Sequence, residues 1–168
     1  MEVDVLPKID LSNSTTGCCP RFDPRGWDGL HVRFDEKLFV RATTRSLLHV
    51  PINMGSVFTP VQTHIEDAGA QDPNGYLVLS RDLSGTEAEH FFAVTRRVPG
   101  EVMTTLSGTF LTRVFEGPYR DAKAWFHQME TAAELEGNWA KRIFMFYTTC
   151  PKCAKAYGKN YVVGFAET

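Results

Sequence analysis

The fold is decided by Thr104–Gly137, which reads "TTLSGTFLTRVFEGPYRDAKAWFHQMETAAELEG". Its first part has the composition of a β-strand, and Gly117-Pro118 predicts a turn into a helix. Gly137 ends that helix. Apolar side chains recur along the helix at the spacing of one face, which predicts a stripe packed on a sheet: Ala122, Phe126, Met129 and Ala133, widened by Trp125.

The segments on either side of this stretch repeat a single order of elements. After the helix, 142–149 and 160–167 are predicted strands, so the second half has the order β-α-β-β. The first half is predicted to have the same order, with strands at 30–34 and 37–52, a helix at 55–70, and strands at 75–80 and 89–98. In its helix a stripe of Val57, Val61 and Ile65 is expected, with Pro60 in the first turn and Gly69 at the end.

We interpret the repeated order as an internal duplication within a single domain of residues 1–168. Residues 1–28 are predicted to be an irregular lead-in, followed by a first half at 30–98 and a second half at 104–167. The predicted fold class is α+β, with β-α-β-β units forming an antiparallel sheet or sheets. Both helices are expected on one face, and a ligand groove is expected between the halves.

The composition excludes several classes of protein. The 168 residues carry a net charge of −2 with scattered Lys and Arg, which argues against a nucleic-acid partner. No apolar run approaches the ~18 residues of a membrane span. The acidic, proline-interrupted start is not typical of a signal peptide. We therefore expect a cytoplasmic protein without a nucleic-acid or membrane partner, and the sequence does not set its oligomeric state.

Four cysteines leave three interpretations open. Cys150 and Cys153 have the two-residue gap of zinc knuckles and of redox pairs, and Cys18-Cys19 is the other pair that could complete a zinc site. Two adjacent cysteines bind one ion only with backbone distortion, and only about one turn of helix is expected after Cys153. We therefore expect thiols buried in a turn and in the lead-in, with no metal and no cofactor, and keep zinc and redox use as alternatives.

Aromatic side chains are the more informative signal, because the chain has twelve Phe, five Tyr and three Trp. By strand alternation, Phe144 and Phe146 share one face of their strand, while Tyr147 lies on the other. Both faces must then be covered, one by the helix and the other by a sheet or a flat apolar ligand. No nucleophile elbow, phosphate-binding glycine loop or metalloprotease motif is present. Among the histidines we keep His49, which we place on a strand that faces the groove.

Four stretches of the chain resemble the GyrI-like (gyrase-inhibitor-like) small-molecule-binding superfamily, and within it the cyclopropanoid cyclopropyl hydrolases. These stretches are "GCCPRFDPRGWD", "DEKLFVRATTRSLLHVPINMG", "LSGTFLTRVFEGPY" and "YTTCPKCAKAYGKNYVVGFAE". The resemblance implies a duplicated fold and an aromatic cage for flat hydrophobic compounds. It also implies hydrolysis of the cyclopropane in DNA-alkylating natural products of the yatakemycin and duocarmycin type, for self-protection, detoxification or drug resistance. Glu89-His90 departs from the pattern, where a Trp and an Asp are expected.

A spiro-cyclopropane conjugated to a carbonyl opens when water attacks its methylene and the carbonyl oxygen becomes a phenol. This chemistry needs an apolar slot, a proton donor and an ordered water, and it needs no metal. For acid or water-orienting roles we select Tyr147, Glu116 and His49. For the walls of the slot we select five aromatic residues: Trp27, Phe115, Phe144, Tyr157 and Tyr161.

Two other functions remain open at this point. A non-catalytic protein could bind and sequester the same hydrophobic, aromatic small molecules without turnover. A ligand-sensing module could pass the signal to a partner, although no helix-turn-helix segment accompanies it here.

Overall fold

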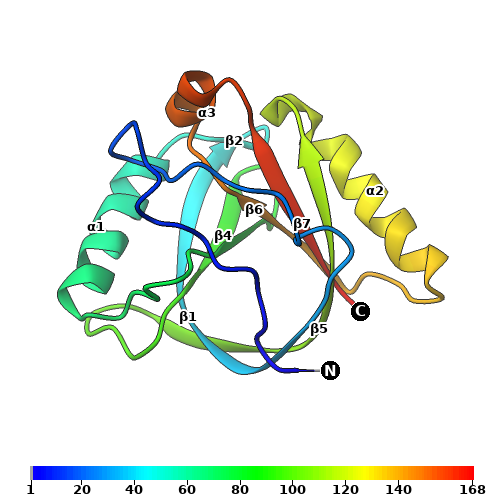
Figure 1. Ribbon diagram of the computed structural model, residues 1–168, viewed down its shortest axis with the longest axis horizontal. Helices are drawn as coiled ribbons and strands as arrows, with labels where there is room; N and C mark the ends of the chain where they lie inside the picture. The colour runs from blue at the N-terminus through cyan, green and yellow to red at the C-terminus, as the bar shows by residue number, and fades with distance from the viewer. Residues whose placement is uncertain (1) are drawn as a thin grey trace. The chain divides into compact units, whose positions relative to one another are not determined.

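The computed structural model describes residues 2–168 and has an α+β fold in two compact units (Figure 1). The β-strands within each unit pair antiparallel, and Val3 forms an isolated parallel bridge with Arg33. The first-repeat unit is Glu36–Leu106. The second-repeat unit combines the chain up to Asp35 with Ser107–Thr168. Two long strands, β1 (His31–Leu47) and β5 (Met103–Glu116), each contribute residues to both units.

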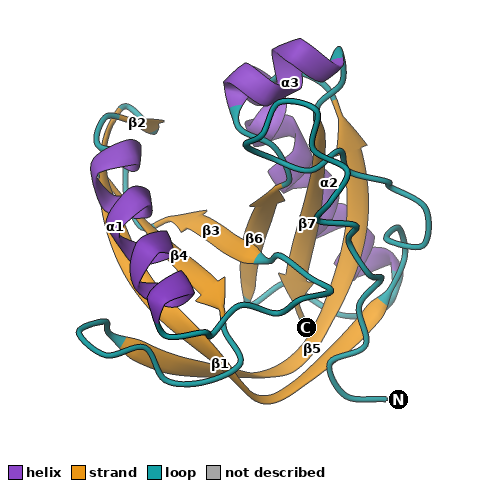
Figure 2. Cartoon of the chain, turned by 60° about the vertical axis from the view of Figure 1, so that its left-hand side comes forward, coloured by secondary structure: helices purple, strands orange, loops and turns teal. Residues whose placement is uncertain are grey.

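The first-repeat unit contains one helix on a small sheet (Figure 2). After β1 come β2 (Val50–Pro51), α1 (Met54–Asp67), β3 (Val78–Asp82) and β4 (Glu87–Ala93), and the strand order is β2-β1-β4-β3. Val61 and Ile65 of α1 pack into a core with Val40, Val78 and Phe92 of the sheet. The helix therefore covers one face of this sheet.

The second-repeat unit repeats that arrangement. After β5 come η1 (Tyr119–Asp121), α2 (Ala122–Leu135), β6 (Arg142–Tyr147), α3 (Pro151–Tyr157) and β7 (Tyr161–Glu167). Strand β7 pairs with both β5 and β6, so its order is β5-β7-β6. In both units the last strand of β-α-β-β thus lies between the first two. The predicted duplication of β-α-β-β units is confirmed.

Helix α2 packs closely on its own sheet. Trp125, Met129 and Ala132 form a core with apolar residues of β5, β6 and β7: Leu111, Phe115, Ile143, Met145, Val162 and Ala166. Gly164 permits the close contact, since a Cβ atom there would lie 2.5 Å from Met129 Sδ. A side chain at this position would have to displace the buried methionine.

Local details differ from the sequence-based expectations. The strands predicted at 30–34 and 37–52 are one strand, β1, which accommodates a positive φ of 52° at Glu36 and is followed by the short β2. Pro60 lies inside α1 beyond its first turn, and Gly69, with φ +60°, follows the helix end as predicted. Phe126 does not belong to the buried stripe of α2, because its side chain is exposed and Ala132 lies in the core instead.

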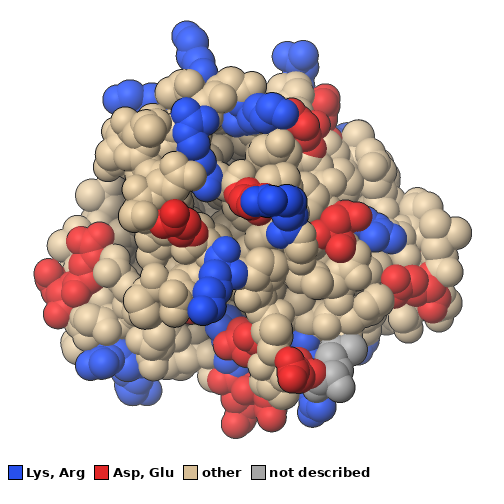
Figure 3. Space-filling view, in the orientation of Figure 1, with Lys and Arg blue, Asp and Glu red and all other residues tan. Residues whose placement is uncertain are grey.

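The segment around the Cys-x-x-Cys pair is also more regular than expected. Helix α3 has seven residues, about two turns, where the sequence predicted about one. Cys150 is its N-cap residue, and Gly158 ends it in the left-handed conformation. No helix of residues 2–168 is long and apolar enough to cross a membrane. On the face shown in Figure 3, acidic and basic side chains are interspersed.

Candidate functional site

An aromatic cluster covers the face of the second-repeat sheet that lies opposite α2. Because Ile143, Met145 and Val162 contact the helix, their neighbours Phe146 and Tyr161 point to the other face. There Phe22 of the lead-in segment (residues 2–28) lies 5.4 Å from Trp27, 6.1 Å from Phe146 and 6.1 Å from Tyr161, measured between ring centroids. The lead-in thus supplies the apolar cover that this face requires.

At one end of this cluster the surface contains a hollow of about 190 Å³, which we call the Tyr161 hollow. The lead-in forms one wall, and the chain on both sides of α3 forms the other. The lining residues are Arg21, Phe22, Thr148, Thr149, Tyr157, Lys159 and Tyr161. Aromatic faces next to a few polar groups are the usual composition of a small-molecule site.

Two cations lie over the two tyrosines of the hollow. The Arg21 guanidinium is 4.3 Å from the centre of the Tyr157 ring, and Lys159 Nζ is 5.9 Å from that of Tyr161. Lys159 Nζ also lies 3.8 Å from a carboxylate oxygen of Glu116. Interaction with the Tyr161 hydroxyl, followed by the charge of Glu116, raises the pKa of Lys159. The lysine is therefore a fixed positive charge at neutral pH.

Hydrogen bonds hold the walls of the hollow. The Tyr157 hydroxyl donates to the carbonyl of Cys19, and its pKa is lowered chiefly by the hydrogen bond with the Thr16 hydroxyl. The Thr148 hydroxyl donates to the carbonyl of Tyr161 at 2.7 Å. Thr149 Oγ1 is buried and has no hydrogen-bond partner among residues 2–168.

Three of the residues selected from sequence lie at or beside this hollow. Tyr157 and Tyr161 line it, and Glu116 is connected to it through Lys159. Glu116 is the cross-strand partner of Tyr161 and therefore shares its face of the sheet. Trp27 lies deeper, with its ring 5.8 Å from that of Phe146 and only 2% of its surface exposed.

The other selected residues lie elsewhere. Phe115 is on the helix side of the sheet, where its ring stacks on Trp125 at 5.6 Å. Tyr147 is also on that side, with its ring 5.8 Å from that of Tyr119. Phe144 is fully buried, 6.3 Å from Phe110. Strand alternation therefore places Phe115 and Tyr147 on the face opposite the Tyr161 hollow, and Phe144 does not line the hollow.

The expectation that His49 lies on a strand is wrong. His49 has a φ of +68° in the turn between β1 and β2, and its side chain is exposed. Its Nδ1 lies 2.9 Å from Asp82 of β3, within the first-repeat unit. The run of apolar residues around it predicted a strand, but the positive φ values of Leu48 and His49 end β1. The ligand groove expected between the halves stays a prediction.

Five lining residues of the hollow were not predicted from the sequence: Arg21, Phe22, Thr148, Thr149 and Lys159. Their positions carried a usable signal, because four of them flank the two cysteine pairs. Arg21 and Phe22 follow Cys19 closely, and Thr148-Thr149 immediately precede Cys150. Only proximity of the two pairs in space brings these four residues together.

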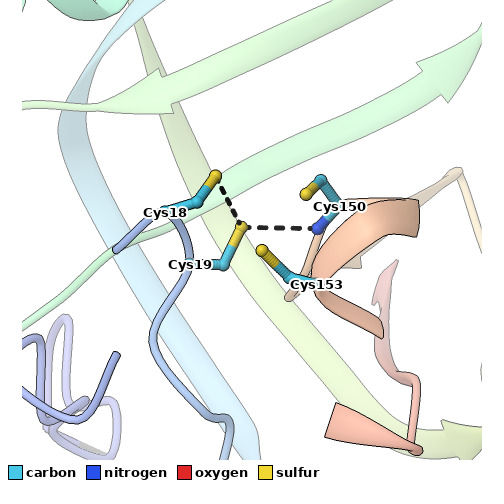
Figure 4. A group of neighbouring side chains, drawn as sticks. All are labelled: Cys18, Cys19, Cys150 and Cys153. Atoms are coloured by element: carbon cyan, nitrogen blue, oxygen red, sulfur yellow. Dashed lines mark hydrogen bonds between the residues drawn. The ribbon is translucent and has the colours of Figure 1, made fainter. Parts of the chain in front are cut away.

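The four cysteines do come together, from the lead-in and from α3 (Figure 4). All four are free thiols, and their Sγ atoms lie within 4.8 Å of one another. Cys19 Sγ accepts a hydrogen bond from the backbone N–H of Cys150 at 3.4 Å. Burial raises the pKa of Cys19. At Cys153 burial also raises the pKa, but the hydrogen bonds that this sulfur accepts, of which that from Thr16 has the largest effect, outweigh burial and lower the pKa to about 6. Among residues 2–168, this cluster of four cysteine sulfurs has the ligands that a soft metal ion prefers.

A second, larger hollow of about 420 Å³ lies in the first-repeat unit. It is lined by Thr43, Thr44, Arg45, Asn53, Thr86 and Glu87. It contains no aromatic ring to hold a flat ligand. We therefore place the candidate site at the smaller hollow, where aromatic, cationic and hydroxyl groups converge.

A family model described as "Bacterial hydrolase" matches residues 9–168, which includes every residue of the Tyr161 hollow and all four cysteines. The chain belongs to this bacterial hydrolase family. Ribose-5-phosphate isomerase A of Listeria monocytogenes serotype 4b is similar over a shorter stretch. The proteins of strains F2365 and CLIP80459 are each 31% identical over 88 residues, which is 52% of this chain and 37% of theirs. The chain thus spans little more than a third of their length.

Membership of the bacterial hydrolase family supports a hydrolytic function in general. The arrangement at the hollow fits such chemistry without a nucleophilic triad. Lys159 and Arg21 can stabilise a developing anion, and the Glu116 carboxylate can orient a water molecule. The aromatic rings offer apolar faces that can hold a flat group and exclude bulk water from one side.

Proposed function

We propose that this member of the bacterial hydrolase family adds water across the cyclopropane of flat, hydrophobic cyclopropanoid compounds that alkylate DNA, and so inactivates them. The observation that supports this most is the pairing of two cations with two tyrosine rings around the Tyr161 hollow. The resemblance of the four sequence stretches to the cyclopropanoid cyclopropyl hydrolases gives the substrate class.

The size of the hollow determines which part of the compound enters. About 190 Å³ is less than the ~300–1,000 Å³ that drug-sized ligands occupy. We infer that the fused-ring head bearing the cyclopropane lies in the hollow against the rings of Phe22 and Tyr161, while the rest of the compound extends along the surface. Burying an aromatic head against such rings gives both affinity and orientation.

The reaction then uses the charges at the rim. The Glu116 carboxylate accepts a proton from water as the water oxygen bonds to the cyclopropane methylene. The broken C–C bond leaves its electron pair on the conjugated system, and the carbonyl oxygen becomes a phenolate. Lys159 and Arg21 stabilise the phenolate. The phenolate then takes up one proton and the Glu116 carboxyl group releases one, so that the product is the substrate plus one water.

Turnover of a duocarmycin-type compound tests this proposal. Excess compound incubated with substoichiometric protein is expected to gain the mass of one water, with many turnovers per chain. Lys159→Met removes the cation nearest Tyr161 and is expected to lower kcat about 100-fold, the order found when one stabilising group is lost. Lys155→Met removes an exposed lysine of α3 that does not line the hollow, and serves as the matched control.

Tight binding of unchanged compound would contradict hydrolysis and establish a sequestering protein in its place. Equal turnover by wild type and Lys159→Met would contradict the assignment of the Tyr161 hollow. Glu116→Gln tests the base independently of Lys159, because it removes the carboxylate but keeps a side chain of the same size. Its kcat is expected to fall with little change in KM, since the carboxylate acts on water and not on the bound head.

A further inference from the structure

We propose that Cys18, Cys19, Cys150 and Cys153 bind one Zn²⁺ ion through four thiolates, and that this ion fastens the lead-in segment to α3. The metal site rests on the positions of the cysteines alone and does not depend on the proposed function. It contributes to the architecture of the Tyr161 hollow and takes no part in the chemistry.

The sulfur atoms have the spacing of a tetrahedral site. With Zn–S bonds of ~2.3 Å, the sulfurs of a tetrahedron are about 3.8 Å apart. Cys18 Sγ and Cys19 Sγ are 3.7 Å apart, and all four sulfurs lie within 4.8 Å of one another. Adjustments of about an ångström or less in side-chain position would close the tetrahedron. The adjacent pair thus reaches ligand spacing with the backbone conformation that it already has.

Burial of apolar thiols does not account for this grouping. A cysteine that acts as a small hydrophobic residue belongs in the core, and only Cys153 meets that description. Cys18 is exposed, while Cys19 and Cys150 are half-buried. Apolar packing does not require these three thiols to lie close together. Coordination of one ion does require it, because all four thiolates must then contact the same metal.

Donors around the sulfurs match what a metal thiolate needs. The backbone N–H of Cys150 points to Cys19 Sγ at 3.4 Å, and the Thr16 hydroxyl lies 3.3 Å from Cys153 Sγ. Hydrogen bonds to ligand sulfur stabilise thiolate charge and fix the ligand orientation. Four thiolates and one Zn²⁺ have a total charge of −2. Lys152, which lies between Cys150 and Cys153 in the sequence, carries a positive charge of the sign that such a site attracts.

The ion would connect the two walls of the Tyr161 hollow. Arg21 and Phe22 follow Cys19 in the lead-in, while Thr149 precedes Cys150 and Tyr157 ends α3. Apart from the cysteines, the hydrogen bonds from Thr16 and Tyr157 and the Arg21–Tyr157 contact hold these segments together. A metal with four ligands, two from each segment, adds a much stronger connection between the lead-in and α3.

Metal analysis of the full chain, purified in reductant and without a histidine tag, tests the site. One zinc per chain is expected, falling below about one tenth in a Cys150→Ser, Cys153→Ser double variant because the remaining pair binds weakly. His127→Ala removes an exposed metal-binding side chain outside the cluster and is expected to keep the zinc. Absence of zinc after incubation with Zn²⁺, or unchanged zinc in the double variant, would overturn the proposal.

Cobalt replacement keeps the test valid if the double variant does not fold. Wild-type protein stripped with a chelator and given Co²⁺ is expected to show intense visible bands of tetrahedral thiolate coordination. Weak octahedral bands, a bound iron centre, or the loss of hydrogens that marks a disulfide in the freshly purified protein would each contradict a zinc site. None of these measurements involves a substrate, so their failure is distinct from failure of the hydrolase proposal.

The structural role has its own readout. Limited trypsin digestion of the chelated protein is expected to cleave after Arg21 and Arg25 at least 10-fold faster than digestion of the zinc-loaded protein, because the lead-in loses its metal connection to α3. Added Zn²⁺ is expected to restore protection. Equal cleavage rates with and without the metal would contradict a role in fastening the lead-in.

Discussion

The two repeats differ most at their last strands, β4 and β7, which occupy the same central place in their sheets. Opposite α1, β4 presents Glu89, whose carboxylate is 2.9 Å from Arg41 and 2.5 Å from Arg81. Opposite α2, β7 presents Tyr161, next to the aromatic ring of Phe22. One topology therefore supports an ionic cluster in the first repeat and an aromatic hollow in the second. A duplicated scaffold therefore fixes strand positions and leaves the chemistry of the face opposite the helix to individual side chains.

The helix sides of the two sheets differ in a related way. Under α1 lies His90, which is 2% exposed and within 2.8 Å of the Thr44 hydroxyl and 2.7 Å of the Ser80 hydroxyl. The counterpart core under α2 contains Gly164 and Met129 in close contact. A polar, hydrogen-bonded centre in the first repeat corresponds to a tightly packed apolar centre in the second.

The largest expected effect is acid sensitivity of the first repeat. Burial lowers the pKa of His90 from its usual 6.5 to about 4. Between these two pH values the unfolded chain binds more protons at His90 than the native protein does. The stability that neutral His90 contributes is therefore fully present above pH 6.5 and is lost as the pH falls towards 4. Urea titrations across this range should show a loss on the order of 3 kcal/mol that His90→Gln reduces, while exposed His127→Gln does not. If the free energy of unfolding of His90→Gln fell with pH as steeply as that of the wild type, buried His90 would not be the cause of the acid sensitivity.

The second expected effect tests the apolar centre of the second repeat. Gly164→Val places a branched side chain against Met129 of α2 and Phe115 of β5, which would lie 2.5 Å and 3.1 Å from the added Cβ atom. The free energy of unfolding is expected to fall by about 2 kcal/mol, measured by urea denaturation. Gly55→Ala is the control, since a Cβ atom there meets nothing within 4 Å and alanine favours the helix α1. Equal stability of both variants would show that the close helix–sheet contact is not required.

The smallest expected effect concerns the ionic cluster. Glu89→Gln keeps the shape of the side chain but leaves Arg41 and Arg81 without their shared carboxylate. Because both guanidinium groups are about one third exposed, the cost is expected to be about 1–2 kcal/mol and not that of a fully buried pair. Asp23→Asn removes the exposed partner of Arg25 and is expected to cost less free energy of unfolding than Glu89→Gln, because water already solvates both charges. A larger loss in Asp23→Asn than in Glu89→Gln would reverse the ranking.

The order of elements was predictable because it depends on local periodicity. The apolar spacing in α2, the glycines after α1 and α2 and the alternation in β6 and β7 all act within a few residues of the chain. The errors also have local reasons. His49 was assigned to a strand because apolar residues surround it, whereas its positive φ makes it a turn residue.

The site was only partly predictable from sequence. Tyr157 and Tyr161 were selected because aromatic residues flank the Cys-x-x-Cys segment, and both line the hollow. Phe115 and Tyr147 were also selected as aromatic residues, but strand alternation directs them to the helix side. Arg21 and Phe22 come from the lead-in, more than 100 residues away from Tyr157 in the chain.

By itself, then, the sequence determined the β-α-β-β repeat and its helices, because each depends on residues close together in the chain. Tertiary structure alone decided that Cys18 and Cys19 meet Cys150 and Cys153, and that Arg21 lies over Tyr157. Such contacts depend on how an irregular segment folds back onto a distant helix, and no periodic pattern in the sequence encodes that path.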